Sequence, residues 1–261
     1  MKVVFLGTGA SAGVPKLGCG CASCGSRPAR GRRRRRSSLL VTSCSGVSVL
    51  IDTAPELREQ VLRLGIVTVD ALLLTHGHPD HILGFYDFHT WMKRMARRVP
   101  VIADSKTIGV ITTVFGVGGL PAVDLIPLGA LEEVSGSQVF DIGDVRAMPM
   151  SVPHGPKEAS VAYMLEERGS GERLGYVTDC SVVPAEVMRQ LEGVRLLVLG
   201  VVKKGPDECH LSLERVTDIV RQLRPKRTIL THMSHEITGS DVKGLGLRNV
   251  RAAEDGLRIK V

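Results

Sequence analysis

The sequence predicts an α/β protein in which layers of β-sheet are covered by helices. Short apolar runs recur along all 261 residues, and amphipathic stretches lie between them. The apolar runs come in clusters early and late in the chain, which argues against an evenly alternating barrel. Hydrophobic residues make up 43% and charged residues 23% of the chain, a balance that excludes a wholly disordered protein.

Ten apolar runs are predicted as strands, because each is short, is rich in Val, Leu and Ile, and has turn-forming or polar residues beside it. In chain order they are Lys2–Leu6, Leu39–Thr42, Val47–Ile51, Ala71–Leu74, Pro100–Ala103, Val145–Met150, Val161–Glu166, Leu174–Thr178, Leu196–Val201 and Thr228–Leu230. The chain shows no repeat of fixed period and no linker. We therefore expect one domain over residues 1–261, with a Cys-rich and Arg-rich insertion at about residues 18–37.

Three stretches are predicted as helices. Pro55–Leu64 has a proline in its first turn and Gly65 after its end, as helix starts and stops often do. Asp87–Arg98 is the second, with its basic face exposed. The third, Leu211–Leu223, places its apolar residues on one face and ends before Pro225.

The net charge of +7 comes from one segment. Seven of the 34 Lys and Arg residues lie between Arg27 and Arg36, and the remaining 27 balance the 27 Asp and Glu. Such a cluster suits contact with phosphate or another polyanion, and a solvated, self-repelling loop is the alternative. Aromatic residues make up only 3% of the chain, which argues against a surface that stacks single-stranded nucleic acid.

Two features bear on the compartment. No apolar run approaches the roughly 18 residues that a spanning helix needs, and Val3–Leu6 is too short for a signal peptide, so we expect a cytoplasmic protein without a membrane partner. Three of the six cysteines form Cys19-x-Cys21-x-x-Cys24, a spacing that favours metal ligands over disulfides.

The most concentrated chemistry lies in His76-Gly77-His78-Pro79-Asp80-His81, directly after a predicted strand. Three imidazoles and a carboxylate in six residues suit Zn, Mn or Fe. His154, Asp179 and His232 each follow another predicted strand, where loops from different strands can converge. Together these residues supply five His and two Asp, enough for two metal ions that share a bridging carboxylate.

This His-x-His-x-Asp-His motif, with a later His, Asp and His, resembles the metallo-β-lactamase superfamily from Leu6 to His235. The resemblance implies an αββα sandwich with a dinuclear metal site at one edge. It assigns His76, His78 and His154 to one metal, Asp80, His81 and His232 to the other, and Asp179 to both. Asp52 matches an early aspartate that supports the metal loop without binding metal.

Further motifs resemble the PhnP-like phosphodiesterases of the carbon–phosphorus lyase pathway, a subgroup of that superfamily. They are Gly7-Thr8-Gly9, Gly13-Val14-Pro15 and the cysteine cluster. The subgroup implies a structural zinc on Cys19, Cys21, Cys24 and His235, and such a Cys₃His set is a closed tetrahedral site. It also implies that His210 and Asp80 are catalytic residues, Asp80 being a metal ligand as well. The run Arg32–Arg36 is denser than the resemblance requires, which leaves the size of the substrate open.

The implied activity is hydrolysis of small cyclic or linear phosphodiesters, with a hydroxide shared by two divalent ions, Mn or Zn, as the nucleophile. A ribonuclease like tRNase Z is one alternative, although no long RNA-clamping insertion is visible and nucleic acid is not the favoured partner. A PqqB-like cofactor-biosynthesis protein and a thiolesterase or lactonase are the others. A homodimer is a further expectation.

Overall fold

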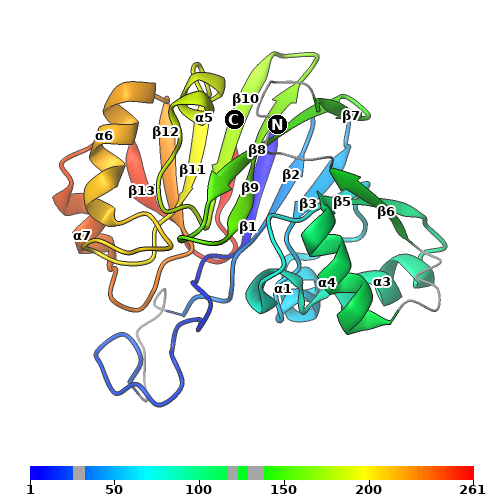
Figure 1. Ribbon diagram of the computed structural model, residues 1–261, viewed down its shortest axis with the longest axis horizontal. Helices are drawn as coiled ribbons and strands as arrows, with labels where there is room; N and C mark the ends of the chain where they lie inside the picture. Colours follow the sequence, from blue (N-terminus) through cyan, green and yellow to red (C-terminus); the bar gives the residue numbers. More distant parts are fainter. Residues whose placement is uncertain (26–32, 117–122, 129–137) are drawn as a thin grey trace.

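The computed structural model describes residues 1–25, 33–116, 123–128 and 138–261, and within them two seven-stranded sheets pack face to face (Figure 1). In spatial order, the first sheet consists of β14 (Arg258–Lys260), β1 (Lys2–Gly7), β2 (Ser38–Thr42), β3 (Ser48–Ile51), β4 (Ala71–Leu73), β5 (Val99–Asp104) and β6 (Val123–Leu128). The second consists of β13 (Val250–Ala252), β12 (Arg227–Thr231), β11 (Leu196–Gly200), β10 (Glu172–Val177), β9 (Ala159–Glu167), β8 (Val145–Pro153) and β7 (Phe140–Ile142).

Helices cover the outer faces of both sheets (Figure 1). On the first sheet lie α1 (Leu57–Leu64), α3 (Phe85–Arg94) and α4 (Ser105–Phe115), and on the second lie α5 (Ala185–Gln190), α6 (Leu213–Leu223) and α7 (Gly239–Gly244). The short helix α2 (Pro79–Ile82) lies in the loop after β4. The order of layers is therefore helix, sheet, sheet, helix, which confirms the αββα sandwich.

Strand β1 shows why its sequence is a continuous apolar run. Val3 and Phe5 pack in the core between the sheets, whereas Val4 and Leu6 pack in the second core beneath the helices of the first sheet. Successive side chains of a strand point to opposite faces, so a strand covered on both sides needs apolar residues at every position.

Both sheets are mixed, and the parallel parts matter for the site. β3 to β6 run parallel to one another, as do β10 to β13. Parallel strands end at the same edge of a sheet, so the residues that follow β4, β10 and β12 gather at one edge of the sandwich.

All ten predicted strands are present, nine of them within two residues at each end and β8 extended by three residues to Pro153. The described chain contains four more, β6, β7, β13 and β14. Three of them have only three residues, and β6, β7, β13 and β14 all lie at or next to a sheet edge. Helix α4 was also missed, because its run of Ile, Val and Thr has strand-like propensity.

Boundaries of all three predicted helices were predicted wrongly, and the third helix, α6, begins at Leu213 rather than at Leu211. Pro55 precedes the helix rather than lying in its first turn, since Glu56 is the N-cap and α1 begins at Leu57; Gly65 ends it as expected, with a φ of 67°. Helix α3 begins at Phe85 and ends at Arg94, four residues before the predicted end, because Ala96 adopts left-handed backbone with a φ of 51°.

The arginine segment is partly described, and Arg27, Arg30 and Arg32 lie outside the described residues. The guanidinium of Arg34 donates to the carbonyl oxygens of Ser234 and Ile237, at 2.7 and 2.9 Å. Arg35 pairs with Glu59 and Asp255, and Arg36 pairs with Glu56. For these three arginines the alternative of a solvated, self-repelling loop is therefore wrong, because they attach the insertion to the rest of the fold. Contact with phosphate or another polyanion stays a prediction.

Candidate metal centre

The candidate centre is assembled at the ends of strands from both sheets. His154 directly follows β8 and His232 directly follows β12, while Asp179 lies two residues beyond β10. His76 follows β4 by three residues, and α2 then carries Asp80 and His81. Pro79 is the first residue of α2, a position where its fixed φ suits the start of a helix.

Three of the residues at this edge have left-handed backbone although none is glycine. The φ angles are 62° at Asp52, 48° at Asp179 and 53° at His232. Such conformations are uncommon outside glycine and cluster at functional sites, where the surrounding structure holds them. Each turns the chain sharply as it leaves a strand and aims the side chain into the centre.

The structure brings all seven predicted His and Asp residues into overlapping groups. Within each group the potential ligand atoms lie within 4.8 Å of one another. The groups are His76, His78 and His154; Asp80, His81 and His232; and His76, His81 and Asp179. His76 and His81 are shared between these groups, and Asp179 lies in the group that contains both, so the seven side chains form one continuous cluster.

Several buried atoms of this cluster lack a hydrogen-bond partner. His76 Nε2, His81 Nε2 and Asp179 Oδ2 are all in this state. An unsatisfied buried polar atom costs free energy, and native proteins rarely keep several together without a ligand. Imidazole nitrogens and carboxylate oxygens are the donors that Zn and Mn accept, so the residues present fit divalent metal ions.

Neighbouring residues fix which nitrogen faces the centre. The carboxylate of Asp52 accepts hydrogen bonds from the backbone N–H and hydroxyl of Thr75 and lies 2.8 Å from His81 Nδ1. The Thr75 hydroxyl also lies 3.0 Å from His76 Nδ1. Both imidazoles are thereby held with Nε2 directed inward, since the hydrogen bond of one ring nitrogen orients the other toward a metal. Asp52 lies where a supporting residue was expected.

A second carboxylate, which the sequence analysis missed, orients His78. Glu158 Oε2 lies 2.8 Å from His78 Nε2, and His78 Nδ1 faces His154 Nε2 at 3.3 Å. His78 therefore presents Nδ1 to the centre, unlike His76 and His81. The Nδ1–H of His154 donates to the carbonyl oxygen of Cys209 at 2.9 Å, which leaves its Nε2 directed inward.

His210 borders the same cluster. Its Nε2 lies 3.2 Å from Asp179 Oδ1, and it forms a further group with His154 and Asp179. Asp207, also missed from the sequence, accepts hydrogen bonds from the backbone N–H groups of Cys209 and His210 and lies 3.1 Å from His210 Nδ1. The only clue in the sequence was its spacing of three residues before His210.

Within the cluster, neighbouring charges shift the pKa values of Asp179 and His81 in the direction opposite to burial. Burial alone would raise the pKa of Asp179, but His232 and His81 beside it lower that pKa well below its usual range. Burial likewise opposes protonation of His81, yet the carboxylates of Asp179, Asp52 and Asp80 raise its pKa well above the usual value. Asp179 thus remains anionic, which is the state in which a carboxylate binds a cation.

The side chains of the centre differ in their exposure to solvent. His76, His81, Asp179 and His232 are buried, whereas the side chains of His78 and His210 are 41% and 19% exposed. A ligand from solvent would therefore meet His78 and His210 first.

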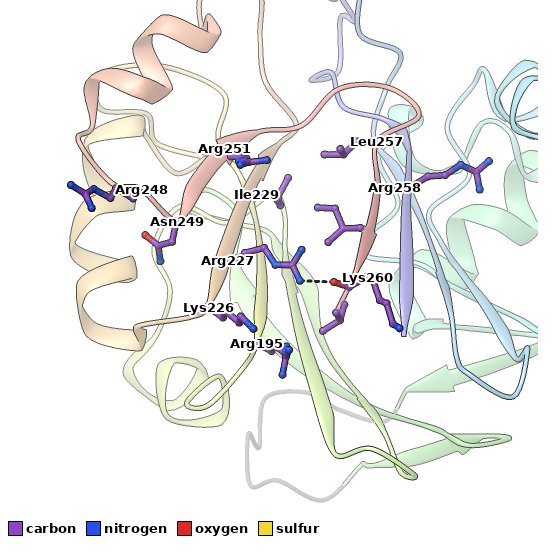
Figure 2. A pocket seen from close by; sticks show the side chains of 12 residues that line it. Arg195, Lys226, Arg227, Ile229, Arg248, Asn249, Arg251, Leu257, Arg258 and Lys260 are labelled. Atoms are coloured by element: carbon purple, nitrogen blue, oxygen red, sulfur yellow. Dashed lines mark hydrogen bonds between the residues drawn. The ribbon is translucent and has the colours of Figure 1, made fainter.

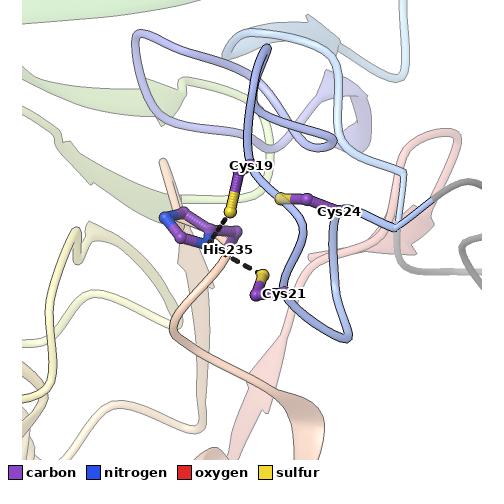
Figure 3. A group of neighbouring side chains, drawn as sticks. All are labelled: Cys19, Cys21, Cys24 and His235. Atoms are coloured by element: carbon purple, nitrogen blue, oxygen red, sulfur yellow. Dashed lines mark hydrogen bonds between the residues drawn. The ribbon is translucent and has the colours of Figure 1, made fainter.

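The cysteine cluster forms a separate group (Figure 3). The ligand atoms of Cys19, Cys21, Cys24 and His235 lie within 4.8 Å of one another, and the Cys21 thiol is 3.2 Å from His235 Nδ1. The backbone N–H of Lys16 donates to the Cys24 sulfur. His235 lowers the pKa of Cys21 to about 6, which favours the thiolate that binds zinc. These donors fit a tetrahedral ion.

Residues 48–233 match the family described as the Beta-lactamase superfamily domain. This range covers most of the chain and includes the whole candidate centre. The chain therefore belongs to the metallo-β-lactamase superfamily. A solved diphosphatase from the PhnP family has a TM-score of 0.88 and 32% sequence identity, with 100% of this chain and 97% of that chain covered. The predicted resemblance to PhnP is thereby confirmed.

Other relatives carry different names. Zinc-bound PqqB from Methylobacterium extorquens has a TM-score of 0.80 and 20% identity, with 100% of both chains covered. Human short-form tRNase Z has a TM-score of 0.70 and 18% identity, with 100% of this chain and 99% of that chain covered. At these identities the two structures show the fold alone. An octanoyltransferase of Porphyromonas gingivalis is 32% identical over 90% of this chain. The chain spans only 46% of that protein's length.

Coenzyme PQQ synthesis protein B of Methylobacterium nodulans is 27% identical over 80% of this chain and 75% of its own. In the described residues no helix has the length and apolar character needed to cross a membrane.

Proposed function

We propose that this chain hydrolyses small phosphodiesters, cyclic or linear, at a dinuclear metal centre. The observation that carries the proposal is the place of Asp179, which forms a group of potential ligands with His76 and His81, one residue from each proposed metal set. A carboxylate between two such sets is what places two cations side by side. His76, His78 and His154 would hold one ion, and Asp80, His81 and His232 the other, with Asp179 between them.

The ions, Mn or Zn, would supply Lewis acidity toward phosphate oxygens and activate water for in-line attack. The protein contributes position and charge. Asp52 and Glu158 hold the imidazole rings in fixed orientations. A third ion, zinc, would occupy the cysteine cluster, where four protein donors leave no open position for substrate.

His210 is proposed as the general acid. Asp207 lies against its Nδ1, so its Nε2 is presented to the side of the centre that solvent reaches. From there an Nε2–H can be donated to the leaving oxygen, which needs a proton when the leaving group is a poor alkoxide.

Phosphorus substrates are preferred because the PhnP-family diphosphatase shares 32% identity over the whole chain. That protein's description as a diphosphatase also favours a second candidate activity, hydrolysis of the P–O–P bond of a diphosphate. The ribonuclease and PqqB-like alternatives rest on weaker likeness, since human tRNase Z and the solved PqqB are 18% and 20% identical.

The test is a hydrolysis panel on metal-reconstituted protein, with a cyclic diester, a linear diester, a diphosphate, a monoester, a thioester, a lactone and a tRNA precursor side by side. We expect the small diesters to have the highest kcat/KM. Asp179→Asn protein from the same preparation serves as the control for contaminating hydrolases. Fastest turnover of the diphosphate would favour the second candidate, and fastest turnover of the tRNA, thioester or lactone would contradict both.

A further inference from the structure

A cationic groove of about 740 Å³ opens between the edges of the two sheets (Figure 2). Strands β13 and β14, the edge strands of the second and first sheets, contribute to its walls. Seven of its twelve lining residues are Arg or Lys, and none is Asp or Glu. Ile229, Leu257 and Ile259 add apolar surface.

The groove is separate from the metal centre. Arg227 is the first residue of β12, and His232 follows the last residue of that strand. At about 3.3 Å per residue, the two lie roughly 15 Å apart along the strand. The groove and the metal centre share no residue.

Most positive charges of the groove have no carboxylate partner in the described residues. Outside the groove, seven of the sixteen arginines in the described residues form an ion pair with a carboxylate, as Arg97 does with Asp70 at 2.6 Å and Arg168 with Asp141 at 3.2 Å. Among the seven groove cations, only Arg195 has such an ion pair within the described residues, with Glu172 at 2.7 Å. Unpaired like charges repel one another, and a multiply charged anion would relieve that repulsion.

Arg227 and Arg251 lie on one face of the second sheet. Arg227 and Ile229 are two residues apart on β12, and Arg251 on β13 is in register with Ile229. The guanidinium of Arg227 also donates to the carbonyl oxygen of Lys260, which fixes its direction (Figure 2). In the same view Arg248 and Arg258 extend away from the groove. Arg227 and Arg251 are therefore the main candidates for anion contact.

Protection of the sheet edges does not account for this pattern. Lysines and arginines on an edge strand prevent pairing with another chain, and this role suits Arg258 and Lys260 on β14. Arg227, however, lies on β12, which is paired on both sides by β11 and β13. A cation at that position protects no edge.

The lining favours a phosphate chain over nucleic acid. Guanidinium groups match phosphate oxygens in bidentate geometry. No aromatic side chain lines the groove, so it offers no surface on which bases stack. We propose that this groove binds a ligand with several adjacent phosphate groups, either a free oligophosphate or the phosphate tail of a nucleotide.

The test is calorimetric binding of inorganic triphosphate to the metal-loaded protein. The double variant Arg227→Ala/Arg251→Ala is compared with Arg146→Ala/Arg168→Ala, which removes the same charge from exposed arginines beside Asp141. Each charge-assisted contact changes Kd about tenfold. We therefore expect the Kd of triphosphate at the groove to rise roughly 100-fold in Arg227→Ala/Arg251→Ala and to stay unchanged in Arg146→Ala/Arg168→Ala. Diester hydrolysis should be unchanged in both. Arg251→Glu, on an exposed residue, repeats the test if Arg227→Ala harms folding.

The remaining outcomes distinguish a free oligophosphate from a nucleotide and show whether the proposal holds. Equal affinity for ATP and triphosphate would indicate the phosphate chain alone, and tighter ATP binding would indicate a nucleotide; both support the proposal. Equal losses in the two double variants, or no loss in either, would overturn it. So would a twelve-nucleotide RNA that binds the groove at least tenfold more tightly than triphosphate.

Discussion

The two clusters of potential metal ligands are built in opposite ways. The His/Asp cluster is drawn from strand ends that lie far apart in the sequence, from His76 to His232, and most of its side chains are buried. The Cys/His cluster takes three donors from one six-residue stretch, Cys19 to Cys24, and Cys21 is exposed. The β-sandwich holds the His/Asp cluster in place, whereas the Cys/His cluster itself holds a loop in place.

The orienting contacts show the same difference. Asp52, Thr75 and Glu158 fix the imidazoles of the first cluster. The second cluster has backbone contacts such as Lys16 to Cys24, and Arg34 holds the chain on either side of His235. The comparison teaches that a centre which must keep positions open for substrate is held by surrounding residues. A closed centre is held by its own ligands.

The largest effect is expected at Asp179. Asparagine keeps the size of the side chain and tolerates the left-handed backbone, so Asp179→Asn removes mainly the charge. Metal-based stabilisation of the transition state is worth several kcal/mol, so diester turnover should fall by about 10³-fold or more. Steady-state kinetics at saturating metal measure it. Wild-type turnover in this variant would exclude Asp179 from the centre.

The centre could be predicted from the sequence because its donors are of unusual type and follow recognisable strands. Glu158 and Asp207 could not, since a carboxylate in a polar loop has no distinguishing pattern until the fold places it against His78 or His210. The ten strands of the two cores could be predicted from apolar runs. The edge strand β14 could not, because only Ile259 of its three residues is apolar.

The next largest effect concerns His210. If it protonates the leaving oxygen, His210→Ala should slow an alkyl diester by about 10²- to 10⁴-fold. A nitrophenyl diester, whose leaving group needs no proton, should be slowed much less, with bound metal unchanged. The ratio of the two rates is the measurement. Equal losses would indicate charge stabilisation instead of proton donation.

A smaller effect is expected at Glu158. Glu158→Gln replaces the carboxylate that lies against His78 Nε2, and loss of such a contact costs about 10- to 100-fold in metal affinity. Competition with a chelator measures that affinity. Glu166→Gln, on β9 in the same hairpin but outside the cluster, is the matched control. Unchanged metal affinity in Glu158→Gln would show that His78 needs no external support.

The smallest effect on catalysis is expected at Cys21. Cys21→Ser should lower the melting temperature and remove zinc, because a structural zinc contributes folding free energy. Turnover by the folded variant should stay within about threefold of wild type. Cys44→Ser, outside both clusters, should change neither zinc content nor melting temperature. An unchanged melting temperature in Cys21→Ser would mean that the cluster stabilises nothing.

The central claim, two separable metal centres of different kinds, is tested most directly by elemental analysis of tightly bound metal in three proteins. The wild type should carry two ions at the His/Asp cluster and one zinc at the Cys/His cluster. Asp179→Asn should keep the zinc and lose ions from the first centre, while Cys21→Ser should lose only the zinc. Loss of the same ions in both variants, or a wild type that retains no metal after reconstitution, would contradict the account.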